Sequence, residues 1–372
     1  MSLTKYKLGN LVELFNEKCD NANLTNWDIS GINSDKEFFE PSKQVGTDTS
    51  SYKNVPSNHF ACNLMHVGRD KVLPIALNYT NKTKIVSPAY TVFKIKENSP
   101  LINEYFFMML KSTERDRLFW FHTDSSVRDG MAWSDFCDIE LSLPSINIQQ
   151  KYVNIYKAMV VNQHSYEKGL DDFKFLCDIY VENLQKTLPL KKIKPYIHRI
   201  DIRNENNLIK NVMGISTKKE FREPTSKVNK NQLSNYKIVK PEQFCFVQTT
   251  HNEKVFAYAY NNTNKDIVIS SVNEVFSVNK EILLPEYLCM FFNRTEFDRY
   301  ARFHSWGSAR ETFTWDDLIN VKIPIADINI QKSISKIYTV YKNRKSINDK
   351  LKLQIKKICP ILIKGSIEEA LK

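Results

Sequence analysis

Two stretches of the chain follow one pattern. WGSARETFTWDDLINVKIPIADINIQKS spans Trp306–Ser333, and SSVRDGMAWSDFCDIELSLPSINIQQK spans Ser125–Lys151. Both contain an arginine, a tryptophan, an aspartate and the tetrapeptide INIQ in the same order, at a constant offset of 182 residues. A repeated stretch of this length predicts a repeated domain.

Further matches extend the repeat in both directions. KEFFEPS at 36–42 matches KEFREPT at 219–225, and EYFFMML at 104–110 matches EYLCMFF at 286–292. The offset stays within two residues of 182, so the copies differ only by small loop insertions. Two copies are too few for a solenoid, which needs at least three repeats. We therefore predict a pseudo-twofold protein with two equivalent modules.

Each module combines strands and helices, so we expect an α+β fold. Short β-like runs are HFACNLMHV, KVLPIAL and YTVFKI in copy one, and FCFVQTT, KVFAYAY and EVFSV in copy two. One helix is expected at roughly 100–117, repeated at 284–299. A long helix then begins near each INIQ.

The long helices have apolar seams at alternating steps of three and four residues. The first seam runs from Tyr152 to Leu184, has one polar member, Gln163, and is predicted to end at Pro189. The second runs from Ile334 to Ile358, is weakened by Arg344 and Asn348, and is predicted to end at Pro360. Helices of this length are long spacers.

The charges of these helices favour pairing between them. The stretch 151–185 has five acidic residues against four lysines, whereas 332–364 has ten Lys and Arg and one acid, Asp349. Opposite charges beside apolar seams favour packing within one chain. The alternative is that each helix only covers its own module.

The net charge of +11 is unevenly distributed. Residues 1–185 hold 20 basic and 23 acidic residues, a net of −3, whereas residues 186–372 hold 33 and 19, a net of +14. A basic balance is compatible with polyanion binding. It is equally compatible with a merely soluble basic surface.

The cysteines and the N-terminus indicate a cytoplasmic protein. Seven scattered cysteines with no CxxC pair indicate reduced, mostly buried thiols, and we expect no metal site. MSLTKYKLGN is not a signal peptide, and no apolar run is long enough to span a membrane.

Motifs for chemistry are missing. The chain has nine glycines and contains neither GxGxxG nor GxxxxGK[ST], and HExxH and GxSxG are absent too. His122 and His304 recur in the repeat, where a core or capping histidine is the more common case than a catalytic one. We expect no catalytic residue and no cofactor.

The residues at this point match a known family. GSARETFTWDDLINVKIPIADINIQKSISKIY and VMGISTKKEFREPT, with the degraded first copy, resemble the specificity subunit of type I restriction–modification enzymes. The first copy departs from the pattern by reading Ser125-Ser126-Val127-Arg128 with an extra Gly130. The resemblance covers the whole chain. It predicts target-recognition domain 1 at 1–145, a spacer helix at 146–188, target-recognition domain 2 at 189–326, and a second spacer helix at 327–372.

The resemblance implies a function as well as a fold. Each recognition domain would read one half of a bipartite, gapped double-stranded DNA target, and the long helices would form an antiparallel coiled coil that fixes the gap. The helices would dock methyltransferase subunits, two in number, and restriction/translocase subunits would join. The subunit itself would be non-catalytic.

Candidate DNA contacts are polar or basic residues on loops. We expect them in the loops after KEF of both copies, at a hairpin tip formed by HVGRDK, and at the arginine of the repeated loop. The candidates in chain order are Lys36, Lys43, His66, Arg69, Lys71, Arg128, Lys218, Lys219, Arg222, Lys227, His251, Asn252, Lys254 and Arg310. Because both copies share Arg128 and Arg310, we expect these to contact the DNA backbone or to pack, whereas Arg69 and Asn252 differ and are better placed to read sequence. For any single residue, a solvated surface charge is the alternative.

Three other functions stay open at this point. The first is a pseudo-symmetric, non-catalytic scaffold or adaptor with incidental nucleic-acid binding. The second is an RNA-binding protein, although the aromatic residues fall mainly at apolar-periodic positions that favour core packing. The third is an enzyme with an unrecognised site.

Overall fold

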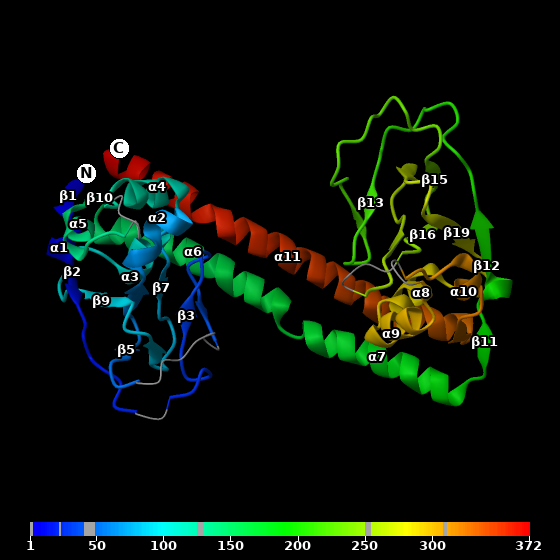
Figure 1. Ribbon diagram of the computed structural model, residues 1–372, viewed down its shortest axis with the longest axis horizontal. Helices are drawn as coiled ribbons and strands as arrows, with labels where there is room; N and C mark the ends of the chain where they lie inside the picture. Colours follow the sequence, from blue (N-terminus) through cyan, green and yellow to red (C-terminus); the bar gives the residue numbers. More distant parts are fainter. Residues whose placement is uncertain (1–2, 22–23, 41–48, 125–129, 250–253, 308–310) are drawn as a thin grey trace. The chain divides into compact units, whose positions relative to one another are not determined.

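The structure is a computed structural model that describes residues 3–21, 24–40, 49–124, 130–249, 254–307 and 311–372 (Figure 1). The chain divides into two compact units. Unit 1 contains Met1–Ser165 together with Asn348–Lys372, and unit 2 contains Tyr166–Ile347. Each unit therefore includes one end of the C-terminal helix.

Unit 1 is built on a four-stranded antiparallel sheet in the order β2-β9-β6-β7. Phe60 of β6 pairs with Phe93 of β9 and Leu77 of β7, and the two phenylalanine rings stack in the core. Three two-stranded ladders, β1-β10, β3-β4 and β5-β8, complete the strand set. The strands are β1 Thr4–Lys7, β2 Val12–Leu14, β3 Gly31–Ile32, β4 Phe38–Phe39, β5 Lys53–Val55, β6 Phe60–Cys62, β7 Ile75–Leu77, β8 Lys84–Val86, β9 Thr91–Ile95 and β10 Glu140–Leu143.

Unit 2 repeats this plan strand for strand. Its sheet has the order β12-β19-β16-β17, and its ladders are β11-β20, β13-β14 and β15-β18. Phe244 of β16 pairs with Phe276 of β19 as Phe60 pairs with Phe93. The strands are β11 Leu190–Lys192, β12 Ile197–Ile200, β13 Gly214–Ile215, β14 Phe221–Arg222, β15 Lys237–Val239, β16 Phe244–Phe246, β17 Tyr258–Tyr260, β18 Ile267–Ile269, β19 Glu274–Val278 and β20 Lys322–Pro324.

The expected helix at 100–117 is two helices in both copies. The chain leaves the helix at Lys111 and is extended at Ser112, and in copy two it is extended at Arg294. The break redirects the second helix, which begins anew with acidic residues in its first turn. The helices of the two units are α1 Leu8–Leu11, α2 Val67–Asp70, α3 Asn103–Leu110, α4 Thr113–Phe121, α5 Trp133–Asp138, α8 Pro285–Phe292, α9 Thr295–Phe303 and α10 Trp315–Ile319, with 3₁₀ turns at Leu64–His66 and Lys194–Tyr196.

The first long helix is also interrupted, contrary to the prediction of one helix. It forms α6, Ile146–Glu167, and α7, Leu170–Thr187. Gly169 between them has a φ of +80°, a left-handed conformation that glycine adopts without steric cost. At the offset of 182, the second copy has Leu351 in place of this glycine, and the helix there is continuous.

The second long helix, α11, runs from Ile328 to Leu371, so the prediction that Pro360 ends it is wrong. Proline in a helix interior removes one backbone hydrogen bond and costs about 3 kcal/mol or more. Packing offsets this cost, because Cys359 and Leu362 on either side of the proline belong to the core of unit 1. Pro360 itself faces solvent.

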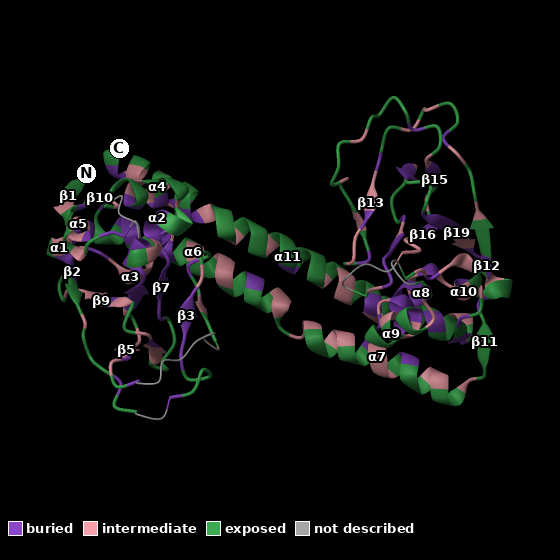
Figure 2. Ribbon diagram, in the orientation of Figure 1, coloured by how far each residue is buried: buried purple, intermediate pink, exposed green. Residues whose placement is uncertain are grey.

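Within each unit a segment of the first long helix packs antiparallel to a segment of α11. In unit 1, Lys151 of α6 binds Glu369 near the end of α11, and Gln163 binds Asn348. In unit 2, Arg344 of α11 donates to the carbonyl of Tyr166, just before α7. Figure 2 shows buried positions interrupting the exposed surface of these helices. The predicted pairing of the long helices is confirmed.

The glutamine of each INIQ joins the helix start to the preceding module. Gln149 accepts from the backbone of Ile102 and donates to the carbonyls of Pro100 and Pro144. Gln331 makes the same three bonds in copy two, to Leu284, Ile282 and Ala326. Both glutamines are fully buried. The repeated tetrapeptide is therefore a structural connection between module and helix.

Candidate nucleic-acid interface

Lys36 lies at the turn of the β3-β4 hairpin, where its φ of 65° closes a tight loop. Its Nζ donates to the carbonyl of Leu73 at 2.9 Å and to Asp116 Oδ1 at 2.6 Å. The same carboxylate accepts from the backbone N–H of Leu73 at 3.1 Å. Burial lowers the pKa of Lys36, while the Asp116 carboxylate acts against that shift. Lys36 and Asp116 therefore form a buried ion pair that fixes the β3-β4 hairpin to α4.

Lys219 repeats this arrangement on the β13-β14 hairpin. It has a φ of 63° and binds Asp298 at 2.8 Å and the carbonyl of Phe292 at 2.7 Å. Asp298 also accepts from the backbone of Phe256. Side chains of Lys36 and Lys219 are only 5% and 7% exposed. The structure gives both a structural role, and we remove both from the candidate DNA contacts.

The neighbouring basic residues of the second hairpin are at the surface. Lys218, Arg222 and Lys227 are all exposed. Among the described residues, Arg222 donates to the carbonyl of the adjacent Glu223 and can reorient at small cost. These three cations remain able to contact phosphate groups.

The segment HVGRDK is not a hairpin tip as predicted. A 3₁₀ turn, Leu64–His66, leads into the short helix α2, which connects β6 to β7. Exposed Arg69 binds Asp70 at 2.7 Å and approaches His66 Nδ1 at 3.1 Å. Burial lowers the pKa of His66, and the Arg69 guanidinium lowers it further. The imidazole is therefore neutral at pH 7 and able to accept or donate one hydrogen bond.

Lys71 and Lys254 occupy equivalent positions after this segment. Both are exposed, with left-handed backbone at φ values of 53° and 55°. Lys71 Nζ lies 4.7 Å from the centre of the Trp120 ring, a cation–π distance. This contact joins Lys71, directly after α2, to Trp120 of α4.

Five of the predicted contacts lie outside the described residues. They are Lys43, Arg128, His251, Asn252 and Arg310. Their expected roles stay predictions.

The sequence reasoning missed two exposed phenylalanines. Phe121 ends α4 and Phe303 ends α9, at the offset of 182, with exposures of 82% and 80%. Each is followed by a histidine, His122 or His304, at the C-cap of the helix, and each ring pair is T-shaped. The repeated FH dipeptide was the available signal. In the sequence only the histidine of this dipeptide was considered as a candidate, whereas the structure shows the phenylalanine to be strongly exposed.

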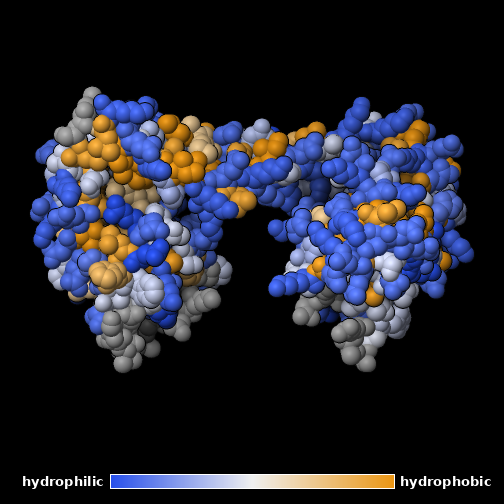
Figure 3. Space-filling model, turned by 90° about the horizontal axis from the view of Figure 1, so that it is seen from above, coloured by the Kyte–Doolittle hydropathy of each residue, from blue (hydrophilic) through white to orange (hydrophobic). Residues whose placement is uncertain are grey.

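The visible surface of unit 2 is mostly hydrophilic, with small hydrophobic patches, whereas unit 1 shows broader hydrophobic areas (Figure 3). Within the described part of the chain, no three His, Cys, Asp or Glu side chains group as metal ligands would. None of the helices in that part is long and apolar enough to cross a membrane. Six of the seven cysteines are buried and all are free thiols, as predicted.

Comparisons with known proteins find similarity in fold. No protein-family model and no curated protein matches the sequence. A crystal structure of the S subunit of a type I restriction–modification system from M. genitalium matches with a TM-score of 0.63 and 12% identity, over 98% of this chain and 96% of that chain. An HsdS subunit from Thermoanaerobacter tengcongensis matches at a TM-score of 0.40 and 13% identity, over 98% of this chain and 96% of that one.

A third structure concerns assembly and conformational transition of the type I system. It matches at a TM-score of 0.43 and 14% identity, over 98% of each chain. The first match includes both repeated modules and both long helices. This chain therefore has the fold of the S subunit of type I restriction–modification systems.

Proposed function

We propose that the chain is the non-catalytic, DNA-binding specificity subunit of a type I restriction–modification complex. The observation that carries this proposal is the duplication itself, because two modules with one strand order each use a segment of a long helix from the other copy. The similarity in fold to an S subunit over nearly the whole chain supports it. Each recognition module reads one half of a bipartite target.

The modules differ where readers of different half-sites should differ. The buried pairs Lys36–Asp116 and Lys219–Asp298 are the same, whereas the exposed hairpin position beside them is Asp35 in unit 1 and Lys218 in unit 2. Direct readout requires side chains on an accessible surface. Arg69, Lys71, Lys218, Arg222, Lys227 and Lys254 satisfy this condition. We propose these as the described members of the DNA interface.

Methyltransferase subunits are the proposed partners of the helices, and restriction/translocase subunits join that complex. The helices expose apolar side chains that pairing within each unit leaves uncovered, including Val161 at 65%, Phe175 at 63% and Ile361 at 64%. Exposed apolar groups on a helix favour association with another protein.

Selection of bound duplexes from a random pool, using the chain assembled with its methyltransferase, tests this function. We expect enrichment of two short half-sites at one fixed spacing, and an affinity that falls steeply with salt. Salt-sensitive binding with no enriched sequence would support the scaffold alternative instead.

A further inference from the structure

A cavity in unit 2 is lined almost entirely by basic and hydrogen-bonding groups. It lies among α7, α8, α11 and the β13-β14 hairpin and has a volume of about 110 Å³. One water needs about 10–15 Å³ of such space, so the cavity has room for several waters or one small anion. Its lining is Lys174, Cys177, Asp178, Lys218, Met290, Asn293, Tyr338, Tyr341, Lys342 and Lys345.

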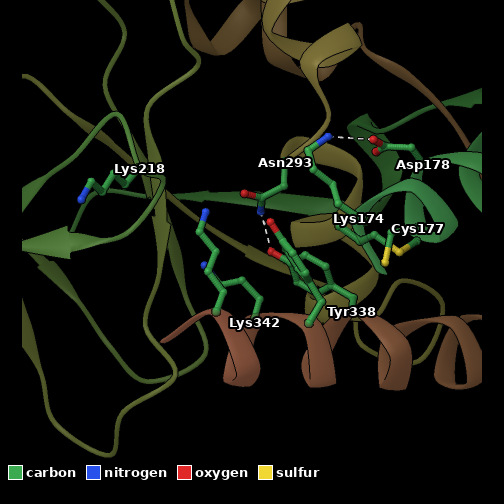
Figure 4. A pocket seen from close by; sticks show the side chains of 10 residues that line it. Lys174, Cys177, Asp178, Lys218, Asn293, Tyr338 and Lys342 are labelled. Atoms are coloured by element: carbon green, nitrogen blue, oxygen red, sulfur yellow. Dashed lines mark hydrogen bonds and ion pairs between the residues drawn. The ribbon is translucent and has the colours of Figure 1, made fainter. Parts of the chain in front are cut away.

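Four lysines face this space against one carboxylate. Lys174 binds Asp178 at 2.8 Å, which neutralises one cation. In the part of the chain that the structure describes, Lys218, Lys342 and Lys345 form no ion pair. Figure 4 shows Lys218 on the opposite side of the opening from Asp178, and the bonded pair Asn293 and Tyr338 between them. Three uncompensated cations around one cavity favour an anion strongly.

The floor of the cavity is rigid. Tyr338 is 6% exposed, and its hydroxyl accepts from the Asn293 amide. The same amide donates to the Tyr258 hydroxyl and to the carbonyl of Cys289. A fixed polar floor with flexible cations around it can hold a tetrahedral oxyanion with little reorganisation.

In unit 1 an ion pair stands at the positions equivalent to two of these lysines. Lys174 corresponds to Lys356 at the offset of 182, and Lys218 corresponds to Asp35 at the offset of 183 that holds for this hairpin. In unit 1, Lys356 and Asp35 form a 2.6 Å ion pair. Lys342 and Lys345 correspond to Val160 and Gln163, which are uncharged. The same scaffold is therefore neutralised internally in one unit and left cationic in the other.

We propose that unit 2 has a binding site for a phosphate group in this cavity, with Lys218, Lys342 and Lys345 as its cations. The group comes from the DNA backbone or from a small phosphate compound. The site is inferred from unit 2 alone and does not depend on the proposed DNA specificity.

Exchange of the two hairpin residues tests the site. Lys218→Asp recreates the unit 1 ion pair and should weaken binding of inorganic phosphate to the full chain by about tenfold or more, measured by calorimetry at constant ionic strength. Lys230→Asp makes the same charge change at an exposed position of unit 2 outside the cavity and should leave phosphate affinity unaltered. Asp35→Lys should not create a second phosphate site, because Val160 and Gln163 supply no cations in unit 1.

Two results would overturn the proposal. One is wild-type chain that binds no phosphate, and the other is equal affinity in wild type and Lys218→Asp when the variant retains its thermal unfolding midpoint. Competition between inorganic phosphate and a random-sequence DNA duplex distinguishes the two sources of the phosphate group. Displacement of phosphate by duplex supports the DNA backbone, and phosphate binding that duplex leaves unchanged supports a small compound. Sequence selectivity of duplex binding is measured separately, so the two proposals fail independently.

Discussion

Gln163 of α6 donates a 2.8 Å hydrogen bond to Asn348 of α11, and both side chains are buried. Each is a polar member of a largely apolar seam. A buried polar pair of this kind fixes the register of two helices, because sliding either helix by one turn separates the amides. Two of the three polar positions in the seams, Gln163 and Asn348, therefore form one interaction in the structure.

Replacement of Asn348 by leucine should destabilise unit 1. The substitution removes an acceptor from a buried amide and should cost about 1–3 kcal/mol of unfolding free energy. The double variant Gln163→Leu/Asn348→Leu should recover most of this loss, because two apolar groups pack without an unmatched amide. Denaturant unfolding of the three variants measures the effect, and a double variant less stable than the single one would contradict it.

Lys36→Met and Lys219→Met should each destabilise the chain strongly. Removal of one partner from a buried ion pair leaves an uncompensated charge and costs about 3–5 kcal/mol. A phosphate contact would instead flatten the salt dependence of DNA binding by about one unit of log–log slope. We expect the folded fraction of each variant to show the same salt dependence of DNA binding as the wild type. A flattened slope with normal stability would return these lysines to the interface.

His66 should titrate below its ordinary pKa of 6.5. The unfolded chain then binds more protons than the folded chain near and below that pH, so this group makes stability fall as the pH drops through 6.5. Arg69→Ala removes a neighbouring cation and frees the Asp70 carboxylate, and both changes should raise the pKa of His66. Chemical shifts of the imidazole against pH measure this, and an unchanged midpoint would exclude the Arg69 contact.

Arg69→Ala should also weaken or relax recognition of one half-site only. The Arg69 side chain belongs to unit 1 and is exposed there. Binding to duplexes with each half-site altered in turn checks this. Equal binding of wild type and variant on both half-sites would remove α2 from the reading surface.

Phe121→Ala and Phe303→Ala should leave stability within about 0.5 kcal/mol, because both rings are exposed. Both units have an exposed phenylalanine at this position, although the two modules are proposed to read different half-sites. The two rings should therefore make a contact that both units share, either with the DNA backbone or with two copies of one partner. Binding of duplex and of methyltransferase to each variant, with Phe60→Ala as a destabilised control, separates these roles. No effect on either binding would leave the rings without function in this complex.

The sequence predicted the duplicated α+β plan and the pairing of the long helices, since both depend on long, repeated patterns. It did not predict the break at Gly169 or the continuation through Pro360. Local rules favour a turn at proline more than at a lone glycine, and here the packing of Cys359 and Leu362 outweighs the local cost.

The candidate site was predicted less well, for a physical reason. A lysine beside a turn has the same letters whether its ammonium meets solvent or a carboxylate 80 residues away, as Lys36 meets Asp116. The repeat contained the missing information. Lys36 and Lys219 recur together with Asp116 and Asp298, and residues shared by two modules with different targets are more often structural than specific.

Mapping of methylated adenines in the source genome tests the central claim most directly, with the gene intact, deleted, and replaced by the Arg69→Ala variant. The account predicts one bipartite, gapped motif that is methylated with the intact gene, loses methylation on deletion, and is relaxed in one half only by the variant. A methylation pattern that deletion leaves unchanged, in cells whose methyltransferase is expressed and active, would contradict it.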